Sequence, residues 1–530
     1  MANKKLQVWL PLLFAIIMTV GMWLGYKLRE DTGGNTSFLN NTKSSSIQEI
    51  LNLIQNKYVD TVSVDTLKED AINEMLGHLD PHSVYIPARE LQEVNEDLQG
   101  NFQGIGVEFQ IFNDTVNIVN VIADGPSFKA GMQVGDKLIK VNDSVMVAGV
   151  KIQPDNIKKL LRGEGGTKVN ITVLRDNKIE KLSIQRGTIP LPSVDAAYMI
   201  EPGKGFIHIN KFAETTYEEF MASLEKLQKQ GMQELVLDLR GNGGGILQEA
   251  ADIADEFLDD DKMIVYTKGG HVPPMEYHCK RDGLFEKGKL TVLVDETSAS
   301  ASEILSGALQ DWDRATIIGR RTFGKGLVQQ QFNLSDNGAL RLTVARYYTP
   351  LGRNIQKPYA DKNHDEYENE LMHRFQDGEV VHGDTSKPAG PSFKTPAGHI
   401  VYGGGGITPD IFIPFDTTAQ PTPVLQLYMK NTLNNFVYEY YIHNKTYLQT
   451  FKTPLDLYAQ FKPGEKEWQQ LSDFAKKDTI DISTVPLKAK ADLLQKLQAM
   501  MARQIWRSEG FYEVSNENDT MIKKALEVMK

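Results

Sequence analysis

Ser300 and Lys325 are the two residues of this chain whose types and surroundings best fit hydrolytic chemistry. Ser300 lies in the small-residue run Thr297–Glu303, directly after the apolar stretch Leu290–Val294, and Lys325 lies between two glycines. A serine hydroxyl is a weak nucleophile until a base removes its proton. A lysine can be that base only when neutral, so burial must lower its pKa by several units, at about 1.4 kcal/mol for each unit. The pair therefore predicts a serine nucleophile served by a lysine base.

The residues around this pair resemble the carboxyl-terminal processing proteases, also called tail-specific proteases, which are serine proteases with a Ser-Lys dyad. The small-residue turn at Ser300, the Thr-Phe-Gly-Lys-Gly loop at Lys325 and their separation along the chain agree with this family. The resemblance extends from about Asp80 to Pro414 and implies that Gln329 orients the lysine. An amide can hold the amine without charging it, whereas a carboxylate would raise the lysine pKa.

Alternating apolar strands and helices must position these residues, which is the pattern of an α/β core. The expected strands include Gly205–Ile209, Glu234–Arg240, Leu290–Val294 and Leu340–Tyr348, and the expected helices include Thr216–Gln230, Leu247–Phe257 and Ala301–Gln310. His208 alternates with apolar residues in its strand, so we interpret it as a packed or edge residue rather than a general base.

A glycine-rich turn, residues 241–245, follows one of these strands and precedes a helix. Such turns also bind phosphate, but no lysine follows at P-loop spacing and no G-x-G-x-x-G pattern is present. In the family that the chain resembles, this turn supplies a backbone donor to the oxyanion hole. The resemblance therefore implies that Ala301 and either Gly243 or Gly244 stabilise the negative charge on the substrate oxygen.

Residues 100–187 resemble a PDZ domain. Phe102–Val107 is similar to the family's carboxylate-binding loop, in which the backbone of Gly104, Ile105, Gly106 and Val107 would face the free end of a peptide. The strand that begins at Val107 would then pair with that peptide by β-augmentation. The expected partners are proteins or peptides with free, apolar carboxyl termini.

The composition limits the function class. The chain has 530 residues, of which 41% are hydrophobic and 24% charged, so most of it should be globular and divided into several domains. The net charge of −11 argues against nucleic acid as a partner. The single cysteine, Cys279, excludes an internal disulfide and is too little for a metal cluster. His78 and His82 are four residues apart, but Pro81 interrupts the helix that such a ligand pair would require. We expect no metal and no organic cofactor.

The amino-terminal residues suggest a membrane anchor. Leu6–Tyr26 is almost wholly apolar and long enough to span a bilayer. Lys4 and Lys5 precede it, which favours a cytoplasmic amino terminus and an extracytoplasmic, periplasmic catalytic body. We therefore expect a single-pass protein of the bacterial inner (cell) membrane. A cleaved signal peptide is the alternative, although no clean Ala-x-Ala follows the apolar run.

These expectations combine into a multidomain α/β and α+β architecture. The predicted parts are a signal anchor (1–30), a linker (31–46), an amino-terminal helical region (47–99), the PDZ domain (100–187), an α/β protease core (188–416) with an insertion at about 359–402, and a carboxyl-terminal helical region (417–530). A homo-oligomer and an adaptor protein remain open. The alternative function is a membrane-tethered PDZ scaffold whose protease fold is inactive, which intact Ser300, Lys325 and Gln329 disfavour.

Overall fold

The computed structural model describes residues 14–24, 45–112, 114–149, 151–359, 366–367, 369–383, 390–416 and 421–530. The chain divides into two units, one ending at Ile72 and the other running from Asn73 to Lys530. The second unit carries all of the predicted site residues.

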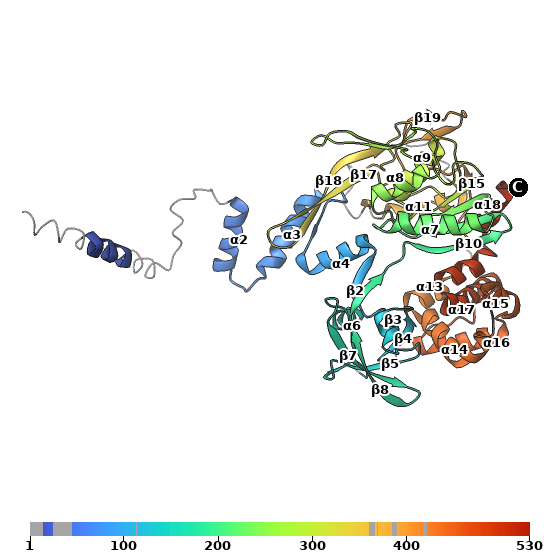
Figure 1. The fold of residues 1–530 in the computed structure, drawn as a ribbon, viewed down its shortest axis with the longest axis horizontal. Coiled ribbons are helices and arrows are strands. Elements are labelled where there is room, and N and C mark those ends of the chain that lie inside the picture. Colours follow the sequence, from blue (N-terminus) through green and yellow to red (C-terminus); the bar gives the residue numbers. More distant parts are fainter. Residues whose placement is uncertain are drawn as a thin grey trace, which may run out of the picture. The chain divides into compact units, whose positions relative to one another are not determined.

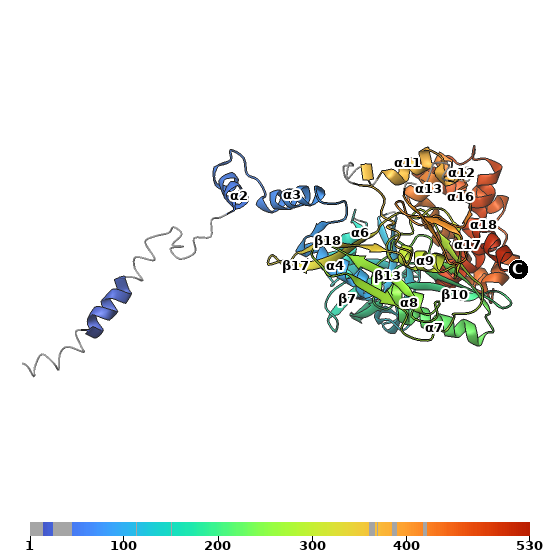
Figure 2. The same cartoon turned by 90° about the horizontal axis from the view of Figure 1, so that it is seen from above.

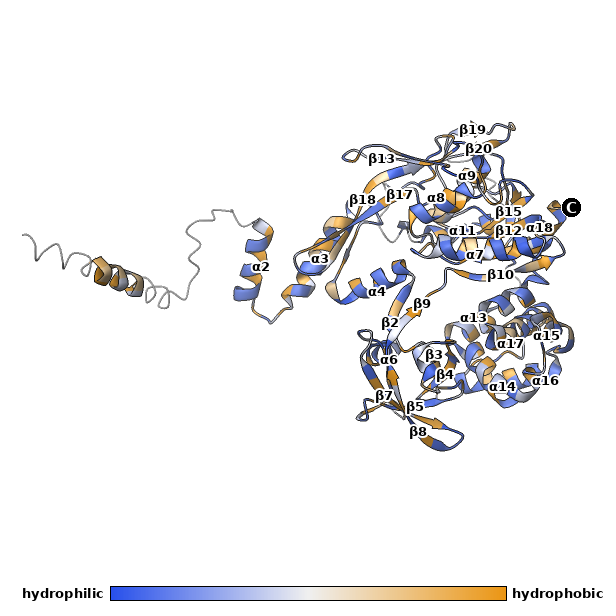
Figure 3. Cartoon of the chain, viewed as in Figure 1, coloured by the Kyte–Doolittle hydropathy of each residue, from blue (hydrophilic) through white to orange (hydrophobic). Residues whose placement is uncertain are grey.

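The first unit contains helices. Residues 14–24 are helical and hydrophobic (Figure 3), α2 spans Ser46–Lys57, and α3, Val64–Gly77, begins in this unit. Only the 14–24 part of the expected anchor Leu6–Tyr26 belongs to the described residues, and the rest lies outside them. Among the described residues, no helix is both long and apolar enough to cross a bilayer.

The second unit begins with the end of α3, followed by a short strand and a helix, and continues into a small β-rich module. The sheet of this module has the order β3-β4-β5-β7-β8, with β6 paired to β5. Its apolar residues, such as Ile118, Leu138 and Ile171, are buried under α6. Strand β3 lies at the edge of this sheet. The elements are β1 (Val84–Ile86), α4 (Ala88–Gln99), β2 (Asn101–Gly104), β3 (Val107–Phe112), β4 (Thr115–Val121), α5 (Pro126–Lys129), β5 (Lys137–Val141), β6 (Val145–Met146), α6 (Pro154–Leu161), β7 (Lys168–Arg175), β8 (Lys178–Gln185) and β9 (Gly187–Pro190).

Strands β2 and β9 connect this module to the rest of the unit. They pair antiparallel, with Asn101 opposite Pro190 and Gly104 opposite Gly187. The chain therefore enters and leaves the module side by side (Figure 1).

A six-stranded sheet with the order β10-β11-β12-β15-β16-β21 forms the middle of the core. Its strands run parallel from β11 onward, and β10 is antiparallel to β11. The strands are β10 (Val194–Glu201), β11 (Lys204–Ile209), β12 (Glu234–Asp238), β15 (Leu290–Val294), β16 (Thr316–Gly319) and β21 (Ile411–Phe412).

Helices cover both faces of this sheet. Leu235 and Leu237 of β12 belong to the cluster formed with α7 (Thr216–Lys229), α8 (Leu247–Asp255) and α9 (Ala301–Asp311). Val236, which points to the opposite face, packs in a cluster with Met521 and Ile522 of α18 (Thr520–Val528). Burial on both faces explains why the strand sequences are almost continuously apolar.

A second sheet has the order β1-β18-β13-β14, with β17 paired to β18. A register shift between Val328 and Gln329 marks a β-bulge or irregularity in β17. Its remaining strands are β13 (Met263–Lys268), β14 (Met275–His278), β17 (Leu327–Asn333) and β18 (Ala339–Tyr348). The structure thus adds strand β1 to a region that the sequence predicted to be helical.

The insertion, about 359–402, is described in part. It contains α11 (Glu370–Gln376), α12 (Glu379–His382), β19 (Ser392–Lys394) and β20 (Ile400–Tyr402), and β19 pairs with β20. Arg374, which is almost completely buried, forms an ion pair with Glu379 at 3.0 Å.

The carboxyl-terminal region is helical, as expected (orange to red in Figures 1 and 2). One contact with the β-rich module is made by the ring of Tyr438, whose centroid lies 5.8 Å from that of Phe112. The described elements are α13 (Thr422–Met429), α14 (Thr432–Leu448), α15 (Pro454–Gln460), α16 (Glu465–Ala475), the 3₁₀ helix η2 (Lys476–Asp478), α17 (Leu487–Asn516) and α18.

The expected multidomain α/β architecture with helical regions is confirmed, but the predicted anchor is not. The predicted boundaries of the individual parts stay predictions.

Candidate active site

Ser300 lies on the sharp turn between β15 and α9. Its backbone has φ of 54° and ψ of −112°, a conformation that residues other than glycine rarely adopt. Such a strained strand-to-helix turn is known from the nucleophile elbow of α/β-hydrolases, where it exposes the serine hydroxyl at the top of the sheet. The turn also places Ser300 directly before the amino terminus of α9, where the helix dipole favours negative charge.

The glycine turn packs directly against this serine. A Cβ atom on Gly244 would lie 2.7 Å from both the Ser300 Cβ and the Ala299 carbonyl oxygen, and φ of Gly244 is +99°. Glycine is therefore required by space and by backbone conformation. The N–H of Gly244 donates to the Asn242 Oδ1 at 2.9 Å, and the Asn242 carbonyl accepts from the N–H of Ala299 at 3.0 Å. These bonds connect the glycine turn to the serine turn.

Glu303 connects the serine turn to the lysine loop. One of its carboxylate oxygens, Oε2, accepts from the backbone N–H groups of both Ser300 and Lys325, each at 2.9 Å. The other, Oε1, accepts from the Gly324 N–H at 2.7 Å and from the Thr322 hydroxyl at 2.5 Å. Since Glu303 is fully buried, it holds two loops that are distant in sequence in one place.

Tyr347 contacts the carbonyl groups of the same two residues whose N–H groups donate to Glu303. Its hydroxyl lies 2.6 Å from the Lys325 carbonyl oxygen and 3.1 Å from the Ser300 carbonyl oxygen. The side chain is buried, and this burial raises its pKa well above the ordinary value, so the hydroxyl stays a donor. Ser300, Lys325, Glu303 and Tyr347 together are called the serine–lysine junction below.

Burial raises the pKa of Glu303 to about 7, although its four hydrogen-bond donors oppose this shift. All four neighbours donate, so the ionised carboxylate is the form that satisfies them. The junction therefore contains a buried carboxyl group that titrates near neutral pH.

The insertion supports the lysine loop from its other side. Arg374 donates to the carbonyl oxygens of Thr322, at 3.1 Å, and Arg321, at 2.5 Å. Nζ of Lys357, a residue just before the insertion, lies 3.8 Å from the centroid of the Phe323 ring. The segment before Lys325 is thus enclosed by buried polar and aromatic contacts.

Gln329 lies at the register shift of β17, and bulges of this kind often re-aim a side chain beside an active site. Its amide nitrogen donates to the carbonyl oxygen of His82. A carbonyl oxygen can only accept, so the amide NH₂ must face it and Oε1 must point elsewhere. His82 itself contacts the Tyr367 hydroxyl at 2.9 Å through Nε2.

Gly104, Ile105, Gly106 and Val107 line a groove of about 420 Å³ in the β-rich module. The carbonyls of Ile105 and Gly106 accept from backbone N–H groups within the module. Other lining residues are Phe109, Lys158, Leu161 and Arg162. The groove runs along the edge strand β3, so an extended peptide has backbone to pair with and two cationic side chains nearby.

Two other nucleophile or base candidates do not belong to this arrangement. Cys279 is buried, and burial raises its pKa to about 12, which disfavours the reactive thiolate. The Nδ1 of His208 lies 2.6 Å from an oxygen of Asp195, which fits a packed structural residue. Among the described residues, no group of three or more possible ligands could hold a metal ion.

Similarity to known proteins agrees with this geometry. The model of peptidase family S41 matches residues 203–364, and the PDZ domain model matches residues 103–185. The carboxy-terminal-processing protease of Bartonella bacilliformis is 37% identical over 314 residues, which cover 58% of this chain and 71% of that protein. A probable CtpA-like serine protease of Staphylococcus haemolyticus is 34% identical over 364 residues, 67% of this chain and 72% of that protein.

The chain belongs to the carboxy-terminal-processing protease family. It is a serine-type peptidase with a PDZ domain. Two further models match this protease, that of the activating protease CtpB N-terminal domain at residues 19–89 and that of a family of unknown function (DUF8443) at residues 424–507. A solved structure, the photosystem II D1 C-terminal processing protease, is 25% identical with a TM-score of 0.35, over 69% of this chain and 92% of that one.

Sequence reasoning missed two residues of this protease, Glu303 and Tyr347. Glu303 had a detectable signal, because Ser300-x-x-Glu303 is the pattern of a capping box at the start of a helix. Tyr347 had none, since it lies in an ordinary strand sequence and its partners are backbone carbonyls.

Proposed function

We propose that this protease is a serine endopeptidase that captures free carboxyl termini of proteins in its PDZ groove and cleaves peptide bonds with Ser300 and Lys325. The observation that carries the proposal is the serine–lysine junction, in which Glu303 and Tyr347 each contact the backbone of both residues. If Ser300 and Lys325 had no shared function, their loops would not need a common set of buried side-chain contacts.

In the acylation step, the neutral amine of Lys325 takes the proton of the Ser300 hydroxyl while Oγ bonds to the substrate carbonyl carbon. The lysine then gives this proton to the leaving amine as the C–N bond breaks. In deacylation, Lys325 takes a proton from a water molecule while its oxygen bonds to the acyl carbon. The proton then returns to Ser300 Oγ as the ester bond breaks, which releases the new carboxyl terminus. Gln329, with its NH₂ group on the His82 carbonyl, has Oε1 left to accept from the Lys325 amine without adding charge.

The N–H groups of Ala301 and Gly243 are the best donors to the substrate oxygen. Both lie in the turns that Asn242 connects, and Gly244 is the weaker choice because its N–H already donates to Asn242. A donor of this kind contributes about 3 kcal/mol to transition-state stabilisation.

The groove would hold the substrate tail by pairing it with β3. The loop Gly104–Val107 would face the terminal carboxylate, and Lys158 and Arg162, which are paired with Asp155 and Glu96, line the same groove. An amidated tail should therefore be cleaved several-fold more slowly than a free one at subsaturating concentration. Equal rates for the two tails would remove the groove from the mechanism.

We also propose that the apolar run Leu6–Tyr26 anchors the protein in the cell membrane, with the catalytic body outside the cytoplasm. Lys4 and Lys5 before the run support this orientation. A cleaved, periplasmic form is the alternative. Fractionation of cells that express the full chain would separate the two.

Cleavage of an unfolded protein with an apolar tail tests the enzyme proposal. We expect the purified full chain to degrade it, and Ser300→Ala and Lys325→Met each to lower the rate by at least about 1,000-fold. Ser223→Ala and Lys229→Met on α7 serve as matched controls and should act like wild type. No cleavage by the wild-type chain would instead support the inactive PDZ scaffold, and equal cleavage rates for wild type and Ser300→Ala would show that Ser300 is not the nucleophile.

A further inference from the structure

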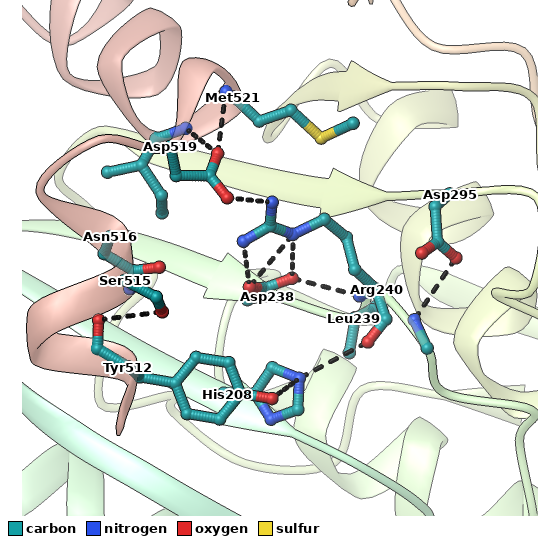
Figure 4. A network of polar contacts seen from close by, with 12 residues as sticks. His208, Asp238, Leu239, Arg240, Asp295, Tyr512, Ser515, Asn516, Asp519 and Met521 are labelled. Carbon is teal, nitrogen blue, oxygen red and sulfur yellow. Dashed lines mark hydrogen bonds and ion pairs between the residues drawn. The ribbon is translucent and has the colours of Figure 1, made fainter. Parts of the chain in front are cut away.

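The carboxyl-terminal helices contact the segment that leads into the glycine turn. Asp238, at the end of β12, binds the Arg240 guanidinium through Nε at 2.9 Å and Nη2 at 2.7 Å. The remaining nitrogen, Nη1, binds an oxygen of Asp519 at 2.7 Å (Figure 4). Asp519 is the residue before α18, and its other oxygen accepts from the N–H groups of Met521 and Ile522. The Arg240 guanidinium is thus fixed between the core and the last helix.

The backbone of Arg240 is held from the same side. The Nε2 of His208 lies 3.3 Å from the Arg240 carbonyl oxygen and 3.0 Å from the hydroxyl of Tyr512 on α17. The rings of His208 and Tyr512 also stack, with centroids 4.3 Å apart (Figure 4). Nδ1 of the same histidine is hydrogen-bonded to Asp195. Tyr512 therefore fixes the imidazole that contacts Arg240.

The charges of this network favour its bonded form. Burial alone would raise the pKa of Asp519, but Arg240 and the capping N–H groups outweigh it and leave this pKa below its ordinary value. Burial alone would lower the pKa of His208, but Asp195 and Asp238 outweigh it and raise this pKa. Asp519 therefore stays ionised and paired near neutral pH, and the raised pKa of His208 favours its protonated, paired form.

A kink in α17 brings these residues to the core. Arg507 has φ of 62° and ψ of −149°, which interrupts the helix. Leu493 and Leu497, before the kink, pack within the carboxyl-terminal helices. Tyr512, after it, packs on Phe206 of β11 with ring centroids 6.0 Å apart. A strained residue is retained only where surrounding contacts fix it, and here the kink turns the end of α17 onto the protease core.

The next residues connect this network to Ser300. The Gly241 N–H donates to Asp295 at 3.2 Å, and the Asn242 carbonyl accepts from the Ala299 N–H at 3.0 Å. The backbone that begins at Arg240 therefore sets where the N–H groups of the glycine turn lie relative to Ser300. A displacement of about 1 Å at a reacting centre can cost about 100-fold in rate.

We propose that Tyr512 and Asp519 are positioning residues that hold Arg240, and through it the glycine turn, in the arrangement that stabilises the transition state. This inference rests on the proposed function, because it assigns the turn to the oxyanion hole. It gives the end of the carboxyl-terminal region a part in catalysis, although neither residue touches the substrate.

Steady-state kinetics of the full chain test this role. Tyr512→Phe removes one hydroxyl, and Asp519→Asn keeps an acceptor for the helix cap but removes the charge. We expect each variant to lower kcat about 10-fold, with KM within about twofold of wild type, because ground-state binding does not use the oxyanion donors. The folded fraction at the assay temperature, from circular dichroism, corrects kcat for any loss of stability.

Asn518→Ala is the matched control. Asn518 precedes Asp519 but donates to Tyr458 within the carboxyl-terminal helices, at 3.1 Å. It should therefore keep wild-type kcat per folded molecule. Wild-type kcat in both Tyr512→Phe and Asp519→Asn, or an equal loss in Asn518→Ala, would overturn the inference. Ser300→Ala separates the positioning role from the proposed function. If this variant cleaved substrate at the wild-type rate, the proposed function itself would be refuted.

Discussion

The serine–lysine junction and the PDZ groove are built in opposite ways. Glu303 and Tyr347 of the junction are buried, and the side chain of each contacts both of its loops. The groove lies along an open sheet edge, and Glu108 on its edge strand pairs with Arg507 of α17, with 48% and 38% of these side chains exposed. Under the proposed function, bonds break at the junction, which requires rigid geometry, whereas the groove must accept different tails.

The contacts of the two regions differ in the same way. Each carboxylate oxygen of Glu303 accepts two hydrogen bonds in the junction, whereas the pair between Glu108 and Arg507 beside the groove is partly exposed. Leaving a buried polar group unsatisfied costs about 1–3 kcal/mol, whereas an exposed ion pair contributes about 0–1 kcal/mol. The contrast predicts that substitutions in the junction have large effects and that substitutions beside the groove have small ones.

Among the residues that hold the two loops or lie beside the groove, the largest effect is expected for Glu303→Gln. A glutamine offers one acceptor oxygen and turns an NH₂ group toward donors, so the Ser300 or Lys325 N–H loses its partner. We expect a fall of at least about 100-fold in kcat and of about 2 kcal/mol in the free energy of unfolding at pH 8. Peptide cleavage and urea unfolding measure these changes. A variant with wild-type kcat would show that Glu303 does not position the loops.

The pH dependence of stability should also depend on Glu303. Its pKa is about 7 in the folded protein and near its ordinary value of 4.5 when unfolded. Between these values the folded state holds a proton that the unfolded state has lost, so this contribution to stability is full below about pH 4.5 and disappears as pH rises through 7.

Urea unfolding of wild type and Glu303→Gln between pH 5 and pH 8 measures this contribution. The free energy of unfolding of wild type exceeds that of Glu303→Gln, and this difference should fall by about 3 kcal/mol as pH rises. An advantage that does not change with pH would mean that the carboxyl group does not titrate in this range.

Tyr347→Phe should have an intermediate effect. The variant loses only the hydroxyl that contacts the carbonyls of Ser300 and Lys325, and Glu303 still holds their N–H groups. We expect a loss of about 1–2 kcal/mol in unfolding free energy and about 10-fold in kcat. Tyr348→Phe, at the neighbouring position of β18, is the control and should change neither quantity by as much.

The smallest effect is expected for Arg507→Ala. The Arg507–Glu108 pair is exposed, and exposed pairs contribute about 0–1 kcal/mol. Urea unfolding should therefore show a loss below about 1 kcal/mol, and 0.5 M salt should abolish most of it. A loss above 2 kcal/mol would mean that the groove is fixed as firmly as the junction.

Sequence patterns predicted the parts that depend on local spacing. The run around Ser300, the loop at Lys325 and the glycine turn could be recognised because each has a distinctive order of small residues. The α/β core followed from alternating apolar stretches. The roles proposed for these residues stay predictions until the variants are measured.

Contacts between distant segments could not be predicted in the same way. Tyr512 and Asp519 lie in a region where helical periodicity indicates packing but not which surface is contacted. The strand β1 has only three residues, which is too short for an alternating pattern to be distinctive. In both cases the partner lies hundreds of positions away, and no local residue pattern identifies it.

The insertion sets a condition for protein engineering. A segment of this kind is usually the first to be trimmed when a protein is shortened. Here Arg374 donates to two carbonyl oxygens of the lysine loop, so removing α11 would take this hydrogen-bond donor away from both oxygens. A shortened or chimeric protease would have to replace the lysine loop together with the insertion, as a single exchangeable block.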